Sequence, residues 1–341
     1  MEMRYRLLGQ TGLRVSELFL GAMTFGDPET VGASPEECRL MLDAYAEVGG
    51  NVVDTASNYR GGASEMIVGE LLEGRRDGFV VSTKYTASRN PSDPNAAGNH
   101  RKNLRLSLET SLRRLRTDYV DIYWVHLWDA HTPIEETVRA LDDAVRAGKV
   151  LYIGISDAPA WVVARANTLA ELKGWTAFAG LQVPYSLLQR DIERELLPMA
   201  EAFGMTVAAW SPLAGGVLSG KFTRPEGPES GTRLSAGSIT DHDLAVARVV
   251  HDVAGEIGAS ASQVAIAWTM VRSTAVHPII GARRLDQLLD NLGALECQLS
   301  ADAVSRLEQA TGFLPGFPRD FIAETSPWVF GAVSSRVDGR H

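Results

Sequence analysis

Eight short apolar segments rich in valine and isoleucine alternate along this chain with longer amphipathic segments. Strands that alternate with helices in this way predict a parallel sheet covered by helices. The candidate strands are Leu18–Gly21, Asn51–Asp54, Phe79–Lys84, Val120–His126, Val150–Ile155, Phe178–Gln182, Thr206–Trp210 and Val276–Ile280. The candidate helices are Ser34–Val48, Ser64–Glu73, His100–Leu115, Pro133–Ala147, Ala158–Asn167, Asp191–Phe203, Asp241–Ile257 and Ser260–Val271.

The ends of these segments carry helix-capping signals. Ser34 precedes Pro and two Glu residues, which is typical of an N-cap with an acidic first turn, and Thr132 opens a similar run. Gly49, Gly148 and Gly204 each follow a candidate helix and precede a strand, where a left-handed C-cap fits. These signals favour the same element boundaries as the apolar pattern.

The number of strand–helix units favours a closed barrel over an open doubly wound sheet. The chain has no G-x-G-x-x-G after its first strand and no G-x-x-x-x-G-K-[ST] phosphate loop. We therefore predict an α/β fold, a (β/α)8 TIM barrel with an N-terminal β-hairpin and additional C-terminal helices, forming one domain over residues 1–341. The long irregular segment Ser211–Thr240 predicts a functional loop. The aromatic tail from Thr311, with Phe317, Phe321, Trp328 and Phe330, is expected to pack over one barrel mouth.

Charge and composition narrow the range of partners. The chain has 33 basic and 42 acidic residues and a formal net charge of −9, which argues against nucleic acid or an anionic membrane as the main partner. No apolar run is long enough to span a bilayer, and the N-terminus lacks the apolar core of a signal peptide, so we expect a cytoplasmic protein. Cys38 and Cys297 are expected to be reduced, buried thiols. The oligomeric state stays open.

Polar residues stand at the ends of three consecutive candidate strands. Asp54, Lys84 and His126 end these strands, and Tyr59 lies five residues after Asp54. Each residue also has a purely structural interpretation. Asp54 could form a turn and Lys84 could be solvated, while His126 and Tyr59 could be core and packing residues. Because barrel active sites lie at the carboxyl ends of the strands, the four are expected to converge at one mouth.

Together these four side chains could protonate a developing alkoxide. A nearby ammonium stabilises phenolate, so we expect Lys84 to lower the pKa of Tyr59, with Asp54 as the counter-ion of Lys84. His126 could donate a hydrogen bond to a carbonyl oxygen or share in proton transfer. Such a site has no nucleophile and no metal cage, so a hydride from a nicotinamide fits the missing step.

The segment from Asp54 to Tyr59, followed by Ser64-Glu65 and Gly69, resembles the first signature of the aldo-keto reductase superfamily. The resemblance runs from Leu13 to about Leu299 and implies a tetrad in which Tyr59 is the general acid. Lys84 and Asp54 would adjust the pKa of Tyr59, and His126 would orient the carbonyl group of the substrate. The long loops resemble the branch that holds bacterial and fungal aryl-alcohol dehydrogenases and potassium-channel β-subunits.

The same resemblance implies a binding site for NADPH. Ser156 and Gln182 would hold the nicotinamide carboxamide, and Asp157 stands where the family usually has Asn, which costs an amide donor when the carboxyl is ionised. Arg283 would pair with the adenosine 2′-phosphate, which favours NADPH over NADH. The remaining implied contacts are Trp210 against the nicotinamide, the pyrophosphate segment with Ser211, Pro212, Leu213, Gly215 and Lys221, and the last segment with Gly281, Gln287 and Asn291.

Several apolar residues are candidates for a substrate wall, although core packing is an equal alternative for each. An aromatic pocket suits apolar or aromatic carbonyl compounds. The candidates are Met23, Phe25, Tyr85, Trp128 and Trp328.

The resulting hypothesis is an NADPH-dependent reductase of a small-molecule aldehyde or ketone. Two alternatives stay open: an NADP(H)-binding redox-sensing or regulatory protein with slow turnover, and a keto-sugar reductase of a biosynthetic pathway. A metal-dependent hydrolase is disfavoured, because His126 and His131 have neither metal-ligand spacing nor a carboxylate cluster beside them, and no metal is expected. The physiological substrate and the direction of reaction stay open.

Overall fold

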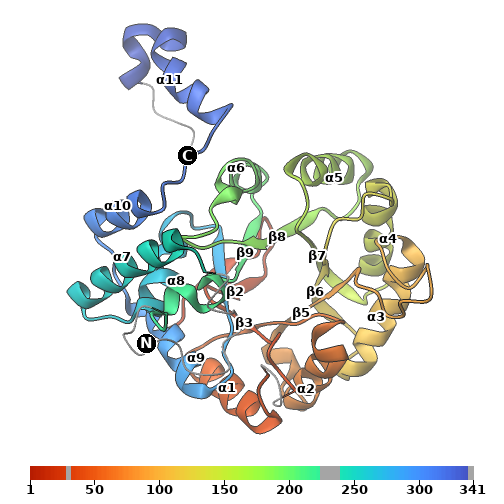
Figure 1. Cartoon of the computed structure of the whole chain (residues 1–341). Helices are drawn as coiled ribbons and strands as arrows, with labels where there is room; N and C mark the ends of the chain where they lie inside the picture. Colours follow the sequence, from red (N-terminus) through yellow and green to blue (C-terminus); the bar gives the residue numbers. More distant parts are fainter. Residues whose placement is uncertain (28–31, 223–238, 337–341) are drawn as a thin grey trace.

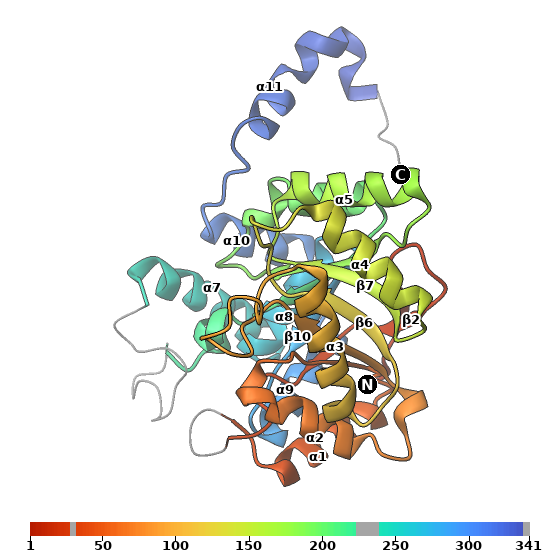
Figure 2. The ribbon, with the colours of Figure 1, turned by 90° about the vertical axis from the view of Figure 1, so that its right-hand side faces the viewer.

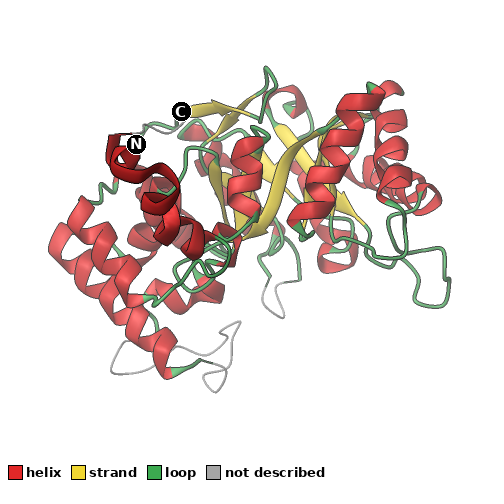
Figure 3. Ribbon diagram, turned by 90° about the horizontal axis from the view of Figure 1, so that it is seen from above, coloured by secondary structure: helices red, strands yellow, loops and turns green. Residues whose placement is uncertain are grey.

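The computed structural model describes residues 1–27, 32–222 and 239–336. Eight parallel strands close into a barrel in the order β10-β3-β4-β5-β6-β7-β8-β9, with helices around it (Figures 1 and 3). The predicted (β/α)8 TIM barrel is confirmed. The barrel strands are β3 (Phe19–Gly21), β4 (Val52–Asp54), β5 (Val80–Tyr85), β6 (Val120–Val125), β7 (Val150–Ser156), β8 (Phe178–Pro184), β9 (Thr206–Trp210) and β10 (Val276–Ile280).

The chain opens with the predicted antiparallel hairpin. Its strands β1 (Tyr5–Leu7) and β2 (Arg14–Ser16) pair with Arg6 opposite Val15. Leu8 and Val15 are fully buried and join the apolar cluster inside the barrel. Because the first barrel strand starts just after this hairpin, the hairpin covers the amino-terminal end of the strands and leaves their carboxyl ends open.

The helices begin where the sequence places caps. The Ser34 side chain accepts a hydrogen bond from the Glu37 amide at the start of α1, and Gly49, Gly148 and Gly204 all have positive φ. Thr132 is different, since its hydroxyl donates to Asp129 instead of capping α4. The helices are α1 (Pro35–Glu47), α2 (Ala63–Leu71), α3 (Arg101–Leu115), α4 (Ile134–Arg146), α5 (Ala160–Lys173), α6 (Leu196–Ala202), α7 (Asp241–Ile257), α8 (Ala261–Val271), α9 (Leu285–Leu292), α10 (Ala301–Ala310) and α11 (Arg319–Phe330).

Two helix predictions need correction. Helix α5 continues six residues past the expected end at Asn167, because its buried residues repeat as far as Ala170 and Gly174 supplies a left-handed C-cap. The single helix expected over Asp191–Phe203 is a short 3₁₀ turn, Asp191–Glu193, followed by α6. The two pieces are separate because Glu195 leaves the helical backbone conformation, with φ −134° and ψ −44°.

The core has two layers, one between the barrel and its helices and one inside the barrel. Trp124 fills the inner layer and has no exposed surface. A Cβ at Gly154 would lie 2.2 Å from the Trp124 ring, and one at Gly180 would lie 2.7 Å from it. Glycine at these two positions of β7 and β8 therefore leaves room for the indole, as close packing of a protein interior requires.

The C-terminal segment does not cover the barrel mouth, contrary to expectation. It leaves the barrel after α10, and α11 projects away from the other helices (Figures 1 and 2). Phe317 and Trp328 are 85% and 84% exposed, and Phe321 and Phe330 are also exposed. Trp328 consequently does not belong to a substrate wall. The aromatic composition of this tail was a poor guide to its position, because composition carries no information about which surface a tail contacts.

Other expectations concern the loop at 211–240 and the cysteines. Of that loop, residues 223–238 lie outside the described residues, and Ala214–Ser219 forms a 3₁₀ segment beside the barrel mouth. Cys38 is buried, and burial raises the pKa of its thiol to about 11, while Cys297 is half-buried; both are free thiols. Within the described ranges, no helix is long and apolar enough to cross a membrane.

Candidate active site

The four residues of the predicted tetrad meet at the carboxyl ends of β4, β5 and β6. The Lys84 ammonium lies 2.5 Å from Asp54 Oδ2, 2.8 Å from the Thr55 carbonyl oxygen and 3.2 Å from the Tyr59 hydroxyl. The rings of Tyr59 and His126 lie edge to face with centroids 5.8 Å apart. The parallel registers of β4, β5 and β6 bring these strand ends to one level, so residues distant in sequence share one site.

Burial sets the protonation states of these groups. Burial raises the pKa of Tyr59 above its ordinary value. The nearby charge of Lys84 lowers this pKa, as expected, but offsets only part of the rise that burial causes. Burial by itself would lower the pKa of Lys84, but the charges and hydrogen bonds of Asp54 and Tyr59 together outweigh burial, and the pKa is raised. For His126, burial and the Lys84 charge lower the pKa to about 4. At neutral pH the site thus holds a phenol, an ammonium and a neutral imidazole.

An ion pair between the half-buried Arg114 and the buried Glu65 holds the loop that carries Tyr59. Arg114 of α3 donates from Nη1 to Glu65 Oε2 at 3.0 Å and to the Ser57 carbonyl oxygen at 2.8 Å. Glu65 has no exposed surface and also accepts from the Thr83 hydroxyl at 2.7 Å. The sequence pattern marked Glu65 but gave Arg114 no role, because only the packing of α3 against α2 brings the guanidinium under this loop.

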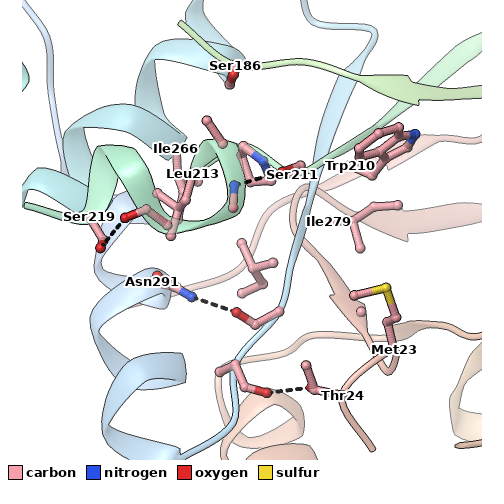
Figure 4. Close-up of a pocket in the computed structure, with 18 of the residues that line it drawn as sticks. Met23, Thr24, Ser186, Trp210, Ser211, Leu213, Ser219, Ile266, Ile279 and Asn291 are labelled. Atoms are coloured by element: carbon pink, nitrogen blue, oxygen red, sulfur yellow. Dashed lines mark hydrogen bonds between the residues drawn. The ribbon is translucent and has the colours of Figure 1, made fainter. Parts of the chain in front are cut away.

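The tetrad opens into one large cavity at the carboxyl ends of the strands. The cavity has a volume of about 1320 Å³, above the roughly 300–1,000 Å³ of an ordinary small-molecule pocket. Asp54, Tyr59 and His126 line it, and Lys84 lies behind them with no exposed surface. Figure 4 shows the middle of the cavity, with Trp210 and Met23 on one side and Asn291 on the other. All thirteen residues that the resemblance assigns to a cofactor line this cavity: Ser156, Asp157, Gln182, Trp210, Ser211, Pro212, Leu213, Gly215, Lys221, Gly281, Arg283, Gln287 and Asn291.

Amide, hydroxyl and carboxyl groups gather beside the tetrad. Gln182 donates from Nε2 to Asp54 Oδ1 at 3.1 Å, which leaves Oε1 as the acceptor of that amide. Trp210 donates from Nε1 to Asp157 Oδ1 at 3.3 Å, and its indole is 39% exposed, so a face of the ring is open to a planar ligand. Burial raises the pKa of Asp157, while hydrogen bonds from Trp210 and Ser156 work in the opposite direction.

The segment after β9 presents backbone amides and a cation to the cavity. Ser211, Ala214, Gly215 and Gly216 all have positive φ, and consecutive turns of this kind form concave anion-binding arrangements of N–H groups. Gly216 has a φ of 97°, which favours glycine, and a Cβ there would lie 2.5 Å from the Lys221 ammonium, so the lysine side chain would have to move. Burial, and then the charge of Arg283, lower the pKa of Lys221. The two cations thus face the same end of the cavity.

The segment after β10 fixes Arg283 at the start of α9. The Arg283 amide donates to Gln287 Oε1 at 3.0 Å, and Asn291 Nδ2 donates to the Gly281 carbonyl oxygen at 3.4 Å. The Glu37 carboxylate accepts from the Leu285 amide at 2.5 Å, so a protein carboxylate already occupies part of the N-terminus of α9. The Arg283 guanidinium is then the main group here for an outside anion.

The predicted substrate wall is only partly present. Met23 lines the cavity, but Phe25 and Tyr85 are fully buried in the core, where Tyr85 stacks on Tyr123. Trp128 packs edge to face on Trp161 and does not line the cavity. For Phe25, Tyr85 and Trp128 the core alternative therefore holds. Residues that the sequence gave no reason to choose line the cavity instead, namely Thr24, Arg60, Pro184, Ser186, Leu188 and Gln189.

Comparison with known proteins decides the family. The model of the aldo/keto reductase family matches residues 17–311. The chain belongs to the aldo/keto reductase family. Norsolorinic acid reductase stcV of Emericella nidulans is 40% identical to this aldo/keto reductase over 92% of the chain and 83% of the relative. The putative aryl-alcohol dehydrogenase AAD14 of Saccharomyces cerevisiae is 36% identical over 94% and 90%. Aldo-keto reductase ausK of Emericella nidulans is 38% identical over 93% and 84%.

These names and the family match agree on an oxidoreductase. The relatives named here come from fungi, so these comparisons support the fungal members of the predicted branch and do not bear on its bacterial members. The aldo/keto reductase match ends at residue 311, at the end of α10, just before the tail that leaves the barrel.

Proposed function

We propose that the protein is an NADPH-dependent reductase of aldehydes or ketones, with Tyr59 as the general acid. The observation that carries this proposal is one continuous cavity. At one end of it, the Tyr59 hydroxyl lies 3.2 Å from a buried ammonium, and at the other end Lys221 and Arg283 bring two cations together. A phenolic acid thus shares a cavity with an anion-binding end, as reduction by a phosphorylated dinucleotide requires.

The groups along this cavity match the successive parts of NADPH, from the nicotinamide to the 2′-phosphate. Ser156 and Gln182 would hold the carboxamide, and the exposed face of Trp210 would pack on the nicotinamide ring. The turns at Gly215 and Gly216 would bind the pyrophosphate, with Lys221 beside them. Arg283 would pair with the 2′-phosphate. When bound, NADPH supplies a hydride for the carbonyl carbon.

The proton comes from Tyr59 in this proposal. Because burial raises its pKa, Tyr59 holds its proton at neutral pH and can donate it to the carbonyl oxygen as negative charge develops there. The phenolate that remains lies next to the Lys84 ammonium, which stabilises it. Asp54 in turn accepts from Lys84 and from Ser82, so the pair stays neutral in total and costs less to bury.

His126 is not the proton donor in this proposal. Its pKa of about 4 makes the imidazole neutral at physiological pH, so it carries no proton to give away as an imidazolium. A neutral imidazole still has one N–H, which can hydrogen-bond to the carbonyl oxygen. We therefore assign to His126 the orientation of the substrate rather than proton donation.

Two observations favour an aromatic carbonyl substrate. The relatives include proteins named for norsolorinic acid reduction and for aryl-alcohol oxidation. The cavity next to the tetrad is bordered by Trp210, Met23 and Leu188, which offer apolar contact to a flat ring.

The intact tetrad also disfavours a purely regulatory binding protein.

The test is oxidation of NADPH by the purified protein with aromatic aldehydes, aryl ketones, aliphatic ketones and keto-sugars, each repeated with NADH. We expect turnover with aromatic carbonyl compounds and a preference for NADPH. Tight NADPH binding without turnover on any carbonyl compound would contradict the proposal and favour the regulatory alternative. Turnover on keto-sugars alone would contradict the substrate class.

A further inference from the structure

The carboxyl group of Asp157 lines the part of the cavity where the nicotinamide is proposed to bind. Asp157 follows β7, and its Oδ1 accepts from Trp210 Nε1 at 3.3 Å. Its own amide donates to the Gln182 carbonyl oxygen at 3.2 Å, which fixes the residue between β7 and β8. The side chain lines the cavity together with the two groups that would hold the carboxamide. Asp157 is thus a fixed part of this wall.

The charge of Asp157 reaches the reacting end of the cavity. Its negative charge contributes to the raised pKa of Tyr59, and the positive charge of Lys84 acts on Asp157 in return. The groups that face it are Trp210 from β9, Ser156 from β7, Lys84 from β5 and Tyr59 from the loop after β4. Trp210 and Ser156 both favour the charged form of the carboxyl by hydrogen bonding.

The two redox forms of a nicotinamide differ by one charge on the ring. The oxidised ring is a cation and the reduced ring is neutral. A carboxylate a few ångströms from the ring attracts the first and has no charge to attract in the second. Binding energy that differs between two states of a ligand shifts the balance between those states.

We propose that Asp157 makes this protein bind NADP⁺ more tightly, relative to NADPH, than an amide at the same position would. The inference rests on the proposed function, since it requires NADP(H) in this cavity. It adds a residue that sets which redox form is favoured, and it makes the bound NADPH a better hydride donor. An amide oxygen at this position would keep an acceptor for Trp210 but would remove the charge.

The substitution Asp157→Asn tests this directly. Asn has the same shape, and like Asp it tolerates the left-handed backbone of this residue, whose φ is 48°. The dissociation constants of NADP⁺ and NADPH are measured separately for both proteins, by quenching of tryptophan fluorescence and by calorimetry. We expect the constant for NADP⁺ to rise on the order of tenfold and that for NADPH to change less than about twofold, as for one partly solvated charge pair.

A matched control removes the same charge elsewhere. Asp290 lines the cavity near α9 and accepts from Gln263 Nε2 at 3.1 Å. Asp290→Asn therefore alters the net charge of the cavity equally without touching the nicotinamide end. It is expected to leave the ratio of the two constants unchanged. If Asp157→Asn folds poorly by thermal melting, Asp157→Gly removes the charge and suits the same φ.

The outcomes separate the two proposals. A ratio that is unchanged in Asp157→Asn, or that changes equally in Asp290→Asn, would overturn the role of Asp157 while leaving the reductase proposal intact. Failure of both redox forms to bind the wild-type protein would overturn both. A selective loss of NADP⁺ affinity in Asp157→Asn supports the inference whatever the carbonyl substrate proves to be.

Discussion

The ammonium nitrogen of Lys84 lies 3.2 Å from the phenolic oxygen of Tyr59, although 24 residues separate the two along the chain. Lys84 has no exposed surface, and its other two hydrogen bonds go to Asp54 and the Thr55 carbonyl. All three ammonium protons thus have acceptors, and the charge is held in one place. This arrangement gives the first two predictions.

Tyr59→Phe is expected to reduce turnover of an aromatic aldehyde by about 10²–10⁴-fold, because it removes the group that donates the proton. The dissociation constant for NADPH is expected to stay within about threefold, since the ring remains and the hydroxyl is not among the proposed cofactor contacts. Steady-state kinetics and fluorescence titration measure the two quantities. A variant with near-normal kcat would show that the proton comes from elsewhere.

Lys84→Met is expected to destabilise the fold by about 3 kcal/mol, because it leaves the Asp54 carboxylate buried without its cation. The double variant Asp54→Asn/Lys84→Met should recover a large part of that loss, since neither charge remains. Urea unfolding of the wild type, both single variants and the double variant measures this coupling. Additive effects of the two substitutions would mean that the ion pair contributes little to the free energy of unfolding. Both variants that lack Lys84 should lose turnover in either case.

Arg283→Ala is expected to raise KM for NADPH by about 10–100-fold while changing KM for NADH little, since the guanidinium would contact only the 2′-phosphate. Arg284 provides the control, because its guanidinium pairs with Asp286 at 3.0 Å on the surface. Arg284→Ala should leave both KM values near those of the wild type. Equal losses with NADPH and NADH in Arg283→Ala would argue for a structural role.

His277 gives a prediction for stability against pH. Burial lowers its pKa from 6.5 to about 4, and its Nδ1 lies 3.0 Å from the Ser16 carbonyl oxygen. Between pH 6.5 and 4 the unfolded chain binds a proton at this residue that the folded protein does not. Stability therefore falls as the pH is lowered through that window, with about 2 kcal/mol lost at this residue by pH 5.

His277→Gln should reduce this dependence, because glutamine can still donate to Ser16 but cannot take up a proton. The difference in free energy of unfolding between pH 7.5 and pH 5 is measured by urea titration for the wild type and the variant. His251→Gln, on the exposed side of α7, is the control and should follow the wild type. The lowered pKa of His126 adds a second, similar dependence that both variants keep. An unchanged slope in His277→Gln would contradict the prediction.

Sequence reasoning was most successful where a residue's role follows from its place on a strand. Asp54, Lys84 and Ser156 end parallel strands, and parallel strand ends in a barrel share one edge, so their meeting at one mouth could be predicted. It failed for Phe25 and Tyr85, which lie near the same strand ends but are buried in the core, and for Trp128, which is partly buried and packs on Trp161. A strand alternates its side chains between two faces, and apolar residues give little sign of which face borders a cavity.

The sequence by itself determined the barrel, most of its helix boundaries and the identity of the polar residues at its mouth. These follow from short-range rules of apolar periodicity, capping and strand order. Only the tertiary structure decided that burial raises the pKa of Tyr59, that Arg114 holds the Tyr59 loop, and that α11 leaves the barrel. Each of these depends on which groups from distant parts of the chain surround a given atom, and solvation and contact at that level are properties of the packed molecule.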